Sequence, residues 1–144
     1  MASPSQNFAS KLTALVVDDD AMTRRIHQMT LSNLGVNNTC VKNGKEAVEI
    51  HQYGKKFDLI LMDKDMPEMN GTEATKQLRL MGISSTIVGV SSHSMEEKEI
   101  VVKFMEAGLD EYLEKPLDKA KLNSILHAVE KIKEKENSIP HKIE

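Results

Sequence analysis

The stretch "LTALVVDDDAM", residues 12–22, runs from an apolar segment directly into three consecutive carboxylates. Its segment Leu12–Val17 is unbroken and contains several β-branched residues, which is typical of a strand covered on both faces. Two unit charges about 4 Å apart repel each other by roughly 4 kcal/mol at an effective dielectric near 20. The acids at positions 18–20 therefore need a cation, an outward-pointing geometry or a functional reason.

Further apolar runs follow along the chain, and helical patterns lie between them. The expected strands cover residues 12–17, 38–42, 58–62, 86–90 and 111–114. Alternating strands and helices with short connections predict a parallel sheet with right-handed crossovers and helices on both faces. We therefore expect an α/β, flavodoxin-like doubly wound (βα)5 fold with the strand order 2-1-3-4-5.

Local signals place the helices between these strands. Apolar residues recur near helical spacing from Met22 to Leu34, at Met22, Ile26, Met29 and Leu34. Asp20 is expected to cap that helix rather than bind metal, and Asn43 to cap the next one. Ser94 followed by Glu97 predicts a capping box at the start of the fourth helix.

Length and composition bound the class of protein. A chain of 144 residues can build one core, expected over residues 11–133 with flexible tails at 1–10 and 134–144. The net charge of −3 provides no basic field for nucleic acid, and no apolar run is long enough to cross a membrane. With the single Cys40 and no signal-peptide pattern, we expect a monomer in the cytoplasm or the nucleus.

Polar residues follow the expected strands at the end where ligands bind in this fold, near the switch between the first and third strands. They are Asp18, Asp19 and Asp20 after the first strand, Asp63 after the third, Ser91 and Ser92 after the fourth, and Lys115 after the fifth. Asp58 begins the third strand and should lie at the opposite end of the sheet. Carboxylates grouped with one lysine suit Mg²⁺, or Mn²⁺ in its place, with phosphate completing the ligand shell. One of these aspartates could then attack phosphorus and form an acyl phosphate, while the metal and the lysine counter the phosphoryl charge.

Four segments resemble the signature blocks of response-regulator receiver domains, in the right order and at the right spacing. They are "VVDDDAMTRR" (16–25), "DLILMDKDMPEMNG" (58–71), "VGVSSHS" (88–94) and "EYLEKP" (111–116). The resemblance covers roughly residues 11–133. Within the family, the sequence is most similar to plant stand-alone response regulators of the phosphatase-like type C.

The resemblance implies a role for each matching residue. Asp63 would be the phosphoacceptor and a metal ligand, Asp19 a direct Mg²⁺ ligand, Asp18 a ligand through water, and the backbone carbonyl of Asp65 the third protein ligand. Ser91 would contact the phosphoryl group together with Lys115, whose peptide bond to Pro116 is commonly cis in the family. Tyr112 matches the aromatic switch residue.

Three positions depart from the commonest family pattern. The resemblance implies that Asp65 and His93 flank the attacking water and tune how long the phosphate survives. Asn70 stands where many members carry Asp, and we expect that difference to be neutral.

The resemblance also implies a partner and a pathway. The chain would take a phosphoryl group from a histidine phosphotransfer protein in cytokinin-type two-component signalling. It would then act through other proteins or drain phosphoryl groups to water. The expected docking residues are Ala21, Met22, Arg25, Pro116 and Leu117.

Several alternatives stand beside this interpretation. Asp63-Lys64-Asp65 superficially fits the D-x-D start of a haloacid-dehalogenase-type phosphohydrolase, but Pro67 stands where that family needs Thr or Val, and its motif belongs on the first strand. A phosphorylation-independent binding module is a third class, against which the intact acidic set argues. A carrier of FMN is disfavoured because acids at 18–20 would repel its phosphate. His27, His51 and His127 are too scattered for a zinc site, and Met62, Met66 and Met69 are expected to fill gaps in packing.

Overall fold

Five strands alternate with five helices within residues 12–94 and 96–138, which the computed structural model describes. In chain order they are β1 (Thr13–Val17), α1 (Ala21–Asn33), β2 (Asn37–Val41), α2 (Gly44–Gln52), β3 (Leu59–Asp63), α3 (Gly71–Leu80), β4 (Thr86–Ser91), α4 (Lys98–Glu106), β5 (Glu111–Glu114) and α5 (Lys119–Ser138). All strand pairs are parallel, and the order across the sheet is β2-β1-β3-β4-β5. The predicted fold class and strand order are confirmed.

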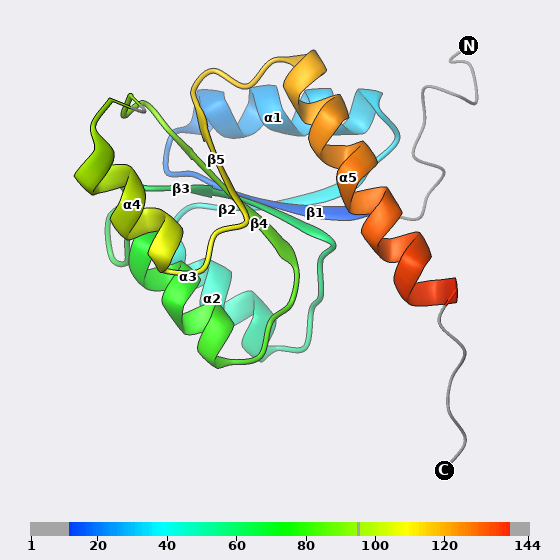
Figure 1. Ribbon diagram of the computed structural model, residues 1–144, viewed down its shortest axis with the longest axis horizontal. Coiled ribbons are helices and arrows are strands. Elements are labelled where there is room, and N and C mark those ends of the chain that lie inside the picture. The colour runs from blue at the N-terminus through cyan, green and yellow to red at the C-terminus, as the bar shows by residue number, and fades with distance from the viewer. Residues whose placement is uncertain (1–11, 95, 139–144) are drawn as a thin grey trace.

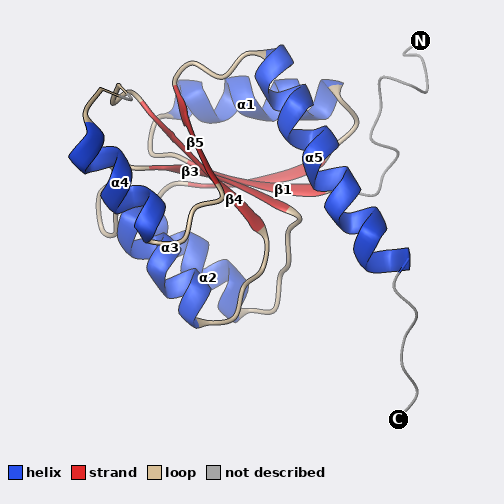
Figure 2. Ribbon diagram, in the orientation of Figure 1, coloured by secondary structure: helices blue, strands red, loops and turns tan. Residues whose placement is uncertain are grey.

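Helices cover both faces of the twisted sheet: α1 and α5 lie on one face, and α2, α3 and α4 lie on the other (Figures 1 and 2). Side chains alternate along β1 between the two resulting cores. Ala14 and Val16 pack with α1 and α5, whereas Leu15 and Val17 pack with the other three helices. Because the central strands are buried on both faces, they read in the sequence as continuous apolar runs.

The predicted helix caps form, with one difference at α4. Asp20 accepts a hydrogen bond from the backbone N–H of Thr23, and Asn43 caps α2 in the same way. Asn70, which was not predicted as a cap, also caps α3. Before α4, the Glu97 carboxylate accepts from the Ser94 N–H at 3.1 Å, but the Ser94 hydroxyl does not reach back to Glu97. Only half of the capping box is present, and α4 begins at Lys98, after both residues.

The apolar periodicity of α1 does not mark its buried face. Met22 is 70% exposed, and Ile26 and Met29 are at least half exposed. The helix instead buries His27 and Leu31, and burial lowers the pKa of the His27 imidazole. Helical spacing shows that apolar residues share a face, but it does not say whether that face meets the core or solvent.

The last helix is longer than the sequence patterns indicate. α5 continues to Ser138, beyond the expected boundary at residue 133. Lys and Glu are good helix formers, so a charged segment can extend a helix that is already packed. The expected N-terminal tail at 1–10, and residues 139–144, lie outside the described part of the chain.

Smaller packing expectations hold. Met62 is fully buried, and Met66 and Met69 are partly buried against the core formed with α2, α3 and α4. Cys40 lies half-buried on β2 against the other core, where burial raises the pKa of its thiol.

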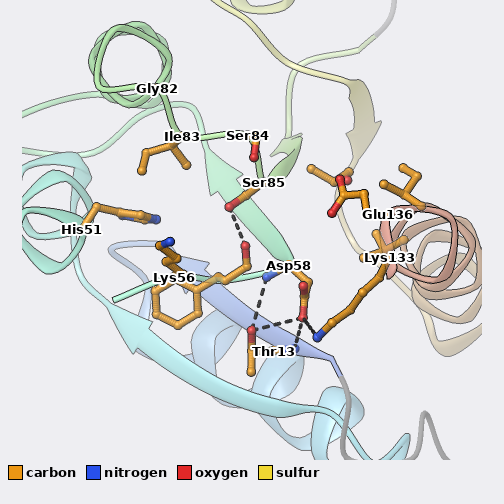
Figure 3. A pocket seen from close by; sticks show the side chains of 14 residues that line it. Thr13, His51, Lys56, Asp58, Gly82, Ile83, Ser84, Ser85, Lys133 and Glu136 are labelled. Atoms are coloured by element: carbon orange, nitrogen blue, oxygen red, sulfur yellow. Dashed lines mark hydrogen bonds and ion pairs between the residues drawn. The ribbon is translucent and has the colours of Figure 1, made fainter. Parts of the chain in front are cut away.

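A cavity of about 430 Å³ opens where the strands begin, and Asp58 lines it (Figure 3). The Asp58 carboxylate accepts from the Thr13 N–H at 2.9 Å and pairs with Lys133 of α5 at 3.1 Å. These contacts tie α5 to the starts of β1 and β3. Asp58 therefore lies at the end of the sheet opposite the strand exits, as predicted.

No helix within the described residues combines the length and apolar character needed to cross a bilayer.

Candidate active site at the carboxyl ends of the strands

Strand register brings Asp18 and Asp63 side by side. Val17 of β1 pairs with Met62 of β3, so the next residue on each strand projects from the same edge of the sheet. Both carboxylates are buried, and Asp63 is only 6% exposed. Parallel pairing between two apolar strands thus delivers two like charges to one place, which the sequence suggested from the strand exits alone.

Lys115 reaches both of these carboxylates from the end of β5. Its Nζ lies 2.8 Å from Asp18 Oδ2 and 3.1 Å from Asp63 Oδ1. The peptide bond between Lys115 and Pro116 is cis, as the family resemblance implies. A single ammonium group therefore bridges the acids of the two central strands.

The electrostatics of this cluster are unbalanced. Burial, and then the neighbouring Asp18 charge, raise the pKa of Asp63 to about 6 against the opposing effects of Lys115 and the Lys64 N–H. Burial also opposes the charge on Lys115, but the hydrogen bond to Asp18 and the charge of Asp63 raise its pKa overall. The carboxyl of Asp63 consequently holds its proton more tightly than an exposed aspartate does.

The acids form a group that fits a hard divalent cation. Among the described residues, Asp18, Asp19 and Asp63 each present a carboxylate oxygen, and these oxygens lie within 4.8 Å of one another. Oxygen donors of this kind suit Mg²⁺, which is held by few carboxylates and keeps several waters. Asp20 is engaged instead at the start of α1, where its carboxylate accepts from Thr23.

The loop between β3 and α3 is held against the site by two glycines. A Cβ on Gly71 would lie 2.0 Å from the backbone oxygen of Asp63, and one on Gly44 would lie 2.5 Å from that of Met69. The Gly71 N–H also donates to the Lys64 carbonyl at 2.8 Å. Such close approach of backbone to backbone leaves no room for a side chain at either position.

His93 links the loop after β4 to the loop after β3. Its Nε2 lies 3.0 Å from Asp65 Oδ2, and its Nδ1 lies 3.0 Å from Glu97 Oε2. The hydrogen bond to Glu97 and then that to Asp65 raise the pKa of His93. Burial acts to raise the pKa of Asp65, but its hydrogen bonds with His93 and Lys64 lower it overall.

Ser91 and Tyr112 complete the side of the site next to β4 and β5. Ser91, the last residue of β4, is buried, and its hydroxyl accepts from the His93 N–H at 3.3 Å. The Tyr112 hydroxyl donates to the backbone carbonyl of His93, and its ring packs edge-on against Phe104. Burial raises the pKa of the Tyr112 phenol.

Most of the expected docking residues lie on the surface, with one correction. Ala21, Met22, Arg25 and Pro116 are exposed. Leu117 is only 3% exposed and packs in the core with α1 and α5, so it cannot present a side chain to a partner. Its position next to the exposed Pro116 suggests a surface residue, but Leu117 packs directly before α5 begins at Lys119.

Two contacts at the site have no clear signal in the sequence. Arg24 Nη1 donates to the backbone carbonyl of Asp18 at 2.8 Å, and Glu97 binds the His93 imidazole. Helical spacing could have suggested Arg24, because it lies four residues after Asp20, the residue that caps α1. The sequence indicates Glu97 only as part of a capping box, because a contact from its carboxylate to His93 depends on the loop conformation.

Comparison with known proteins shows what this chain resembles. The family model described as "response regulator receiver domain" matches residues 14–127. Two-component response regulator 24 of Arabidopsis thaliana is 57% identical over 119 residues, which cover 82% of this chain and 84% of that protein. Two-component response regulator ARR22 of the same plant is 51% identical over 112 residues, covering 77% and 78% respectively.

Solved structures agree with this fold. A CheY-like response regulator receiver domain from Methylobacillus flagellatus superposes with a TM-score of 0.73 at 29% identity, covering 83% of this chain and 99% of that one. The receiver domain of the Francisella response regulator 1452 superposes with a TM-score of 0.75 at 27% identity, covering 85% and 99%.

Proposed function

This chain belongs to the response regulator receiver domain family, and from that membership we propose that it accepts a phosphoryl group from a histidine phosphotransfer protein onto Asp63. One observation carries the proposal: the buried Asp63 carboxylate lies 3.1 Å from Lys115 Nζ, within a group of acids that fits Mg²⁺. The nucleophile, a counter-charge and a metal-binding set are thus in one place.

The transfer step needs few groups. An oxygen of the Asp63 carboxylate attacks the phosphorus of a phosphohistidine, so a new P–O bond forms as the P–N bond breaks and the imidazole leaves. Lys115 is placed to pair with the phosphoryl oxygens, and Ser91 can donate its hydroxyl to them. Asp18, Asp19, Asp63 and the carbonyl of Asp65 would hold Mg²⁺, which when bound neutralises charge on the transferring group.

We propose further that the aspartyl phosphate is short-lived, so that the chain drains phosphoryl groups in cytokinin-type two-component signalling. The contact of 3.0 Å between Asp65 and His93 supports this, because it fixes two polar side chains from the two loops that follow β3 and β4. Identity of 57% and 51% to two Arabidopsis two-component response regulators supports a role in two-component signalling. The haloacid-dehalogenase alternative is disfavoured because the acceptor ends β3, not the first strand.

Phosphotransfer measured in vitro tests the proposal. A radiolabelled histidine phosphotransfer protein is mixed with the chain, with and without Mg²⁺, and the label on each protein is followed. We expect Mg²⁺-dependent loss of label from the donor and no transfer to Asp63→Asn. The control Asp58→Asn makes the same change at the opposite end of the sheet and should behave as the unsubstituted chain. Absence of transfer to the unsubstituted chain, or full transfer to Asp63→Asn, would contradict the function.

The lifetime of the phosphate tests the draining role separately. The labelled chain is purified from its donor, and loss of label is timed for the unsubstituted chain, Asp65→Asn and His93→Ala. We expect rapid loss from the unsubstituted chain and slower loss from both variants. A phosphate that survives for hours on the unsubstituted chain would leave the receiver function standing and remove the draining role.

A further inference from the structure

We propose that Glu97 is a positioning residue that holds the His93 imidazole against Asp65 and thereby sets the rate at which the phosphate on Asp63 is hydrolysed. The inference rests on the proposed function and names a regulator of that same site. Glu97 lies outside the acid cluster and precedes α4, so it acts through His93.

The contacts of the imidazole carry the first step. Both ring nitrogens of His93 are engaged at 3.0 Å, one by Glu97 from its own loop and one by Asp65 from a loop 28 positions away. A histidine side chain with free nitrogens can exchange between staggered rotamers and ring orientations. Because both nitrogens are bound, a single rotamer and ring orientation is selected, and the ring spans the gap between the two loops.

The contacts of Glu97 carry the second step. Its Oε2 binds the imidazole, while its Oε1 accepts the Ser94 N–H at 3.1 Å. The carboxylate is therefore itself held by the backbone of the loop, directly before α4 begins at Lys98. A carboxylate that is held in place can orient the His93 imidazole, whereas a freely rotating carboxylate cannot.

Asp65 carries the third step. Its Oδ2 binds His93, and its Oδ1 pairs with Lys64 Nζ at 3.2 Å. In hydrolysis, a water oxygen bonds to phosphorus, the bond from phosphorus to the Asp63 oxygen breaks, and Asp63 is regenerated as a carboxylate. Both hydrogens of the water leave with the inorganic phosphate, so the step needs the water to be held in line with phosphorus. The Asp65 carboxylate, fixed by its contacts with His93 and Lys64, is the hydrogen-bond acceptor that can hold it there.

The exposure of His93 and Glu97 limits how much their contact can change the lifetime of the phosphate. The His93 side chain is 27% exposed and Glu97 is more exposed still, so solvent screens their attraction. The contact therefore acts through orientation. We expect a several-fold change in the lifetime of the phosphate, with little change in its uptake.

Hydrolysis rates of purified phosphorylated chains at saturating Mg²⁺ test the proposal. Glu97→Ala should lengthen the half-life by about threefold to tenfold, as expected for loss of one orienting contact at a partly exposed site. Glu97→Gln keeps an oxygen that can accept from Nδ1–H, so its half-life should stay within about twofold of the unsubstituted chain. The control Glu96→Ala removes the adjacent exposed carboxylate and should have no effect.

A double-substitution cycle separates an effect through His93 from a general loosening of the loop. In a His93→Ala background, Glu97→Ala should change the half-life no further, because the side chain through which it acts is gone. An equal lengthening with and without His93 would overturn the inference. So would a half-life in Glu97→Ala equal to that of the unsubstituted chain.

The contact itself can be measured without phosphate. The imidazole ¹⁵N resonances of His93 in the unphosphorylated chain should move in Glu97→Ala and stay in place in Glu96→Ala. Unmoved resonances in Glu97→Ala would overturn the inference even if phosphotransfer proceeds as proposed. If the chain takes up no phosphoryl group, the proposed function and the lifetime claim fall together, and the resonances alone decide the contact.

Discussion

At the scale of single residues, the carboxyl group of Asp63 is held in a state that favours arrival of a cation. Burial and the charge of Asp18 raise its pKa to about 6, and Lys115 offsets only part of that effect. A protonated carboxyl is a poor nucleophile, whereas a cation bound to Asp18, Asp19 and Asp63 would favour the ionised form. The arrangement that destabilises the acid therefore also prepares it for metal and phosphate.

This raised pKa predicts how stability depends on pH in the absence of divalent cations. The folded chain binds the Asp63 proton up to about pH 6, whereas the unfolded chain releases it near 3.8. As pH rises through that window, the folded state alone keeps the proton, so stability falls by about 3 kcal/mol in total. Asp63→Asn has no carboxyl group to ionise in this window, so its stability relative to the unsubstituted chain should increase between pH 4 and pH 7.

Urea unfolding of the unsubstituted chain and of Asp63→Asn, each at pH 4 and at pH 7, measures this increase in stability. The difference between their free energies of unfolding should widen toward neutral pH and shrink when Mg²⁺ is added. A difference that is constant with pH would contradict the assignment of the raised pKa to Asp63.

At the scale of elements, α3 is fixed at its first turn. Asn70 Oδ1 accepts from the Glu73 N–H at 2.9 Å, and the adjoining Gly71 lies against the backbone of Asp63. The cap and the glycine together determine where α3 starts relative to β3. A change at either position therefore reaches Asp63 through the backbone.

The cap predicts two outcomes at one position. Asn70→Ala removes the acceptor for the Glu73 N–H and should cost about 1 kcal/mol in the free energy of unfolding. Asn70→Asp keeps an acceptor and should be close to neutral, in line with the Asp found at this position in many family members. Chemical denaturation of both variants checks this, and an Asp variant as unstable as the Ala variant would show that capping is not the cause.

The elements also show what the sequence could predict and what it could not. Central strands were predictable because burial on both faces requires unbroken apolar runs, and the acids at strand exits followed from parallel topology. The buried face of α1 was not predictable, because the exposed residues Met22 and Ile26 are apolar and stand at helical spacing, as a core residue such as Leu31 would. Nor was the bridge from His93 to Asp65, which depends on the path of two irregular loops and has no periodic signal.

At the scale of the whole molecule, the acid cluster makes folding sensitive to a bound cation. Three carboxylate oxygens within 4.8 Å repel one another, and among the described residues Lys115 is the cationic side chain that pairs with two of these acids. A ligand that binds only the folded chain stabilises it by mass action.

Mg²⁺ should therefore raise the melting temperature of the chain. At a free concentration ten times its Kd, the stabilisation should be about 1.4 kcal/mol. Asp19→Asn, which removes an exposed member of the cluster, should respond less. Thermal unfolding with and without millimolar Mg²⁺ measures both, and an unchanged melting temperature in the unsubstituted chain would contradict a metal site at this edge.

The exposed face of α1 predicts where the phosphotransfer protein docks. Met22 is 70% exposed, with Ile26 and Met29 beside it on the same helix. Met22→Glu should slow transfer from the histidine phosphotransfer protein but leave labelling by a small phosphodonor such as acetyl phosphate unchanged. Leu80→Glu, at an 87% exposed position on α3, is the control. Equal slowing with both donors would place the effect in the chemistry and not in docking.

The hydrogen bond from Tyr112 reaches the main chain of His93, not its side chain. Any residue at position 93 offers the same backbone carbonyl, so the side chain there can change without removing the acceptor for the Tyr112 hydroxyl. The imidazole meanwhile faces Asp65 and Glu97. We therefore expect two separable controls: substitution at position 93 should alter the lifetime of the proposed phosphate while leaving the backbone contact of Tyr112 in place.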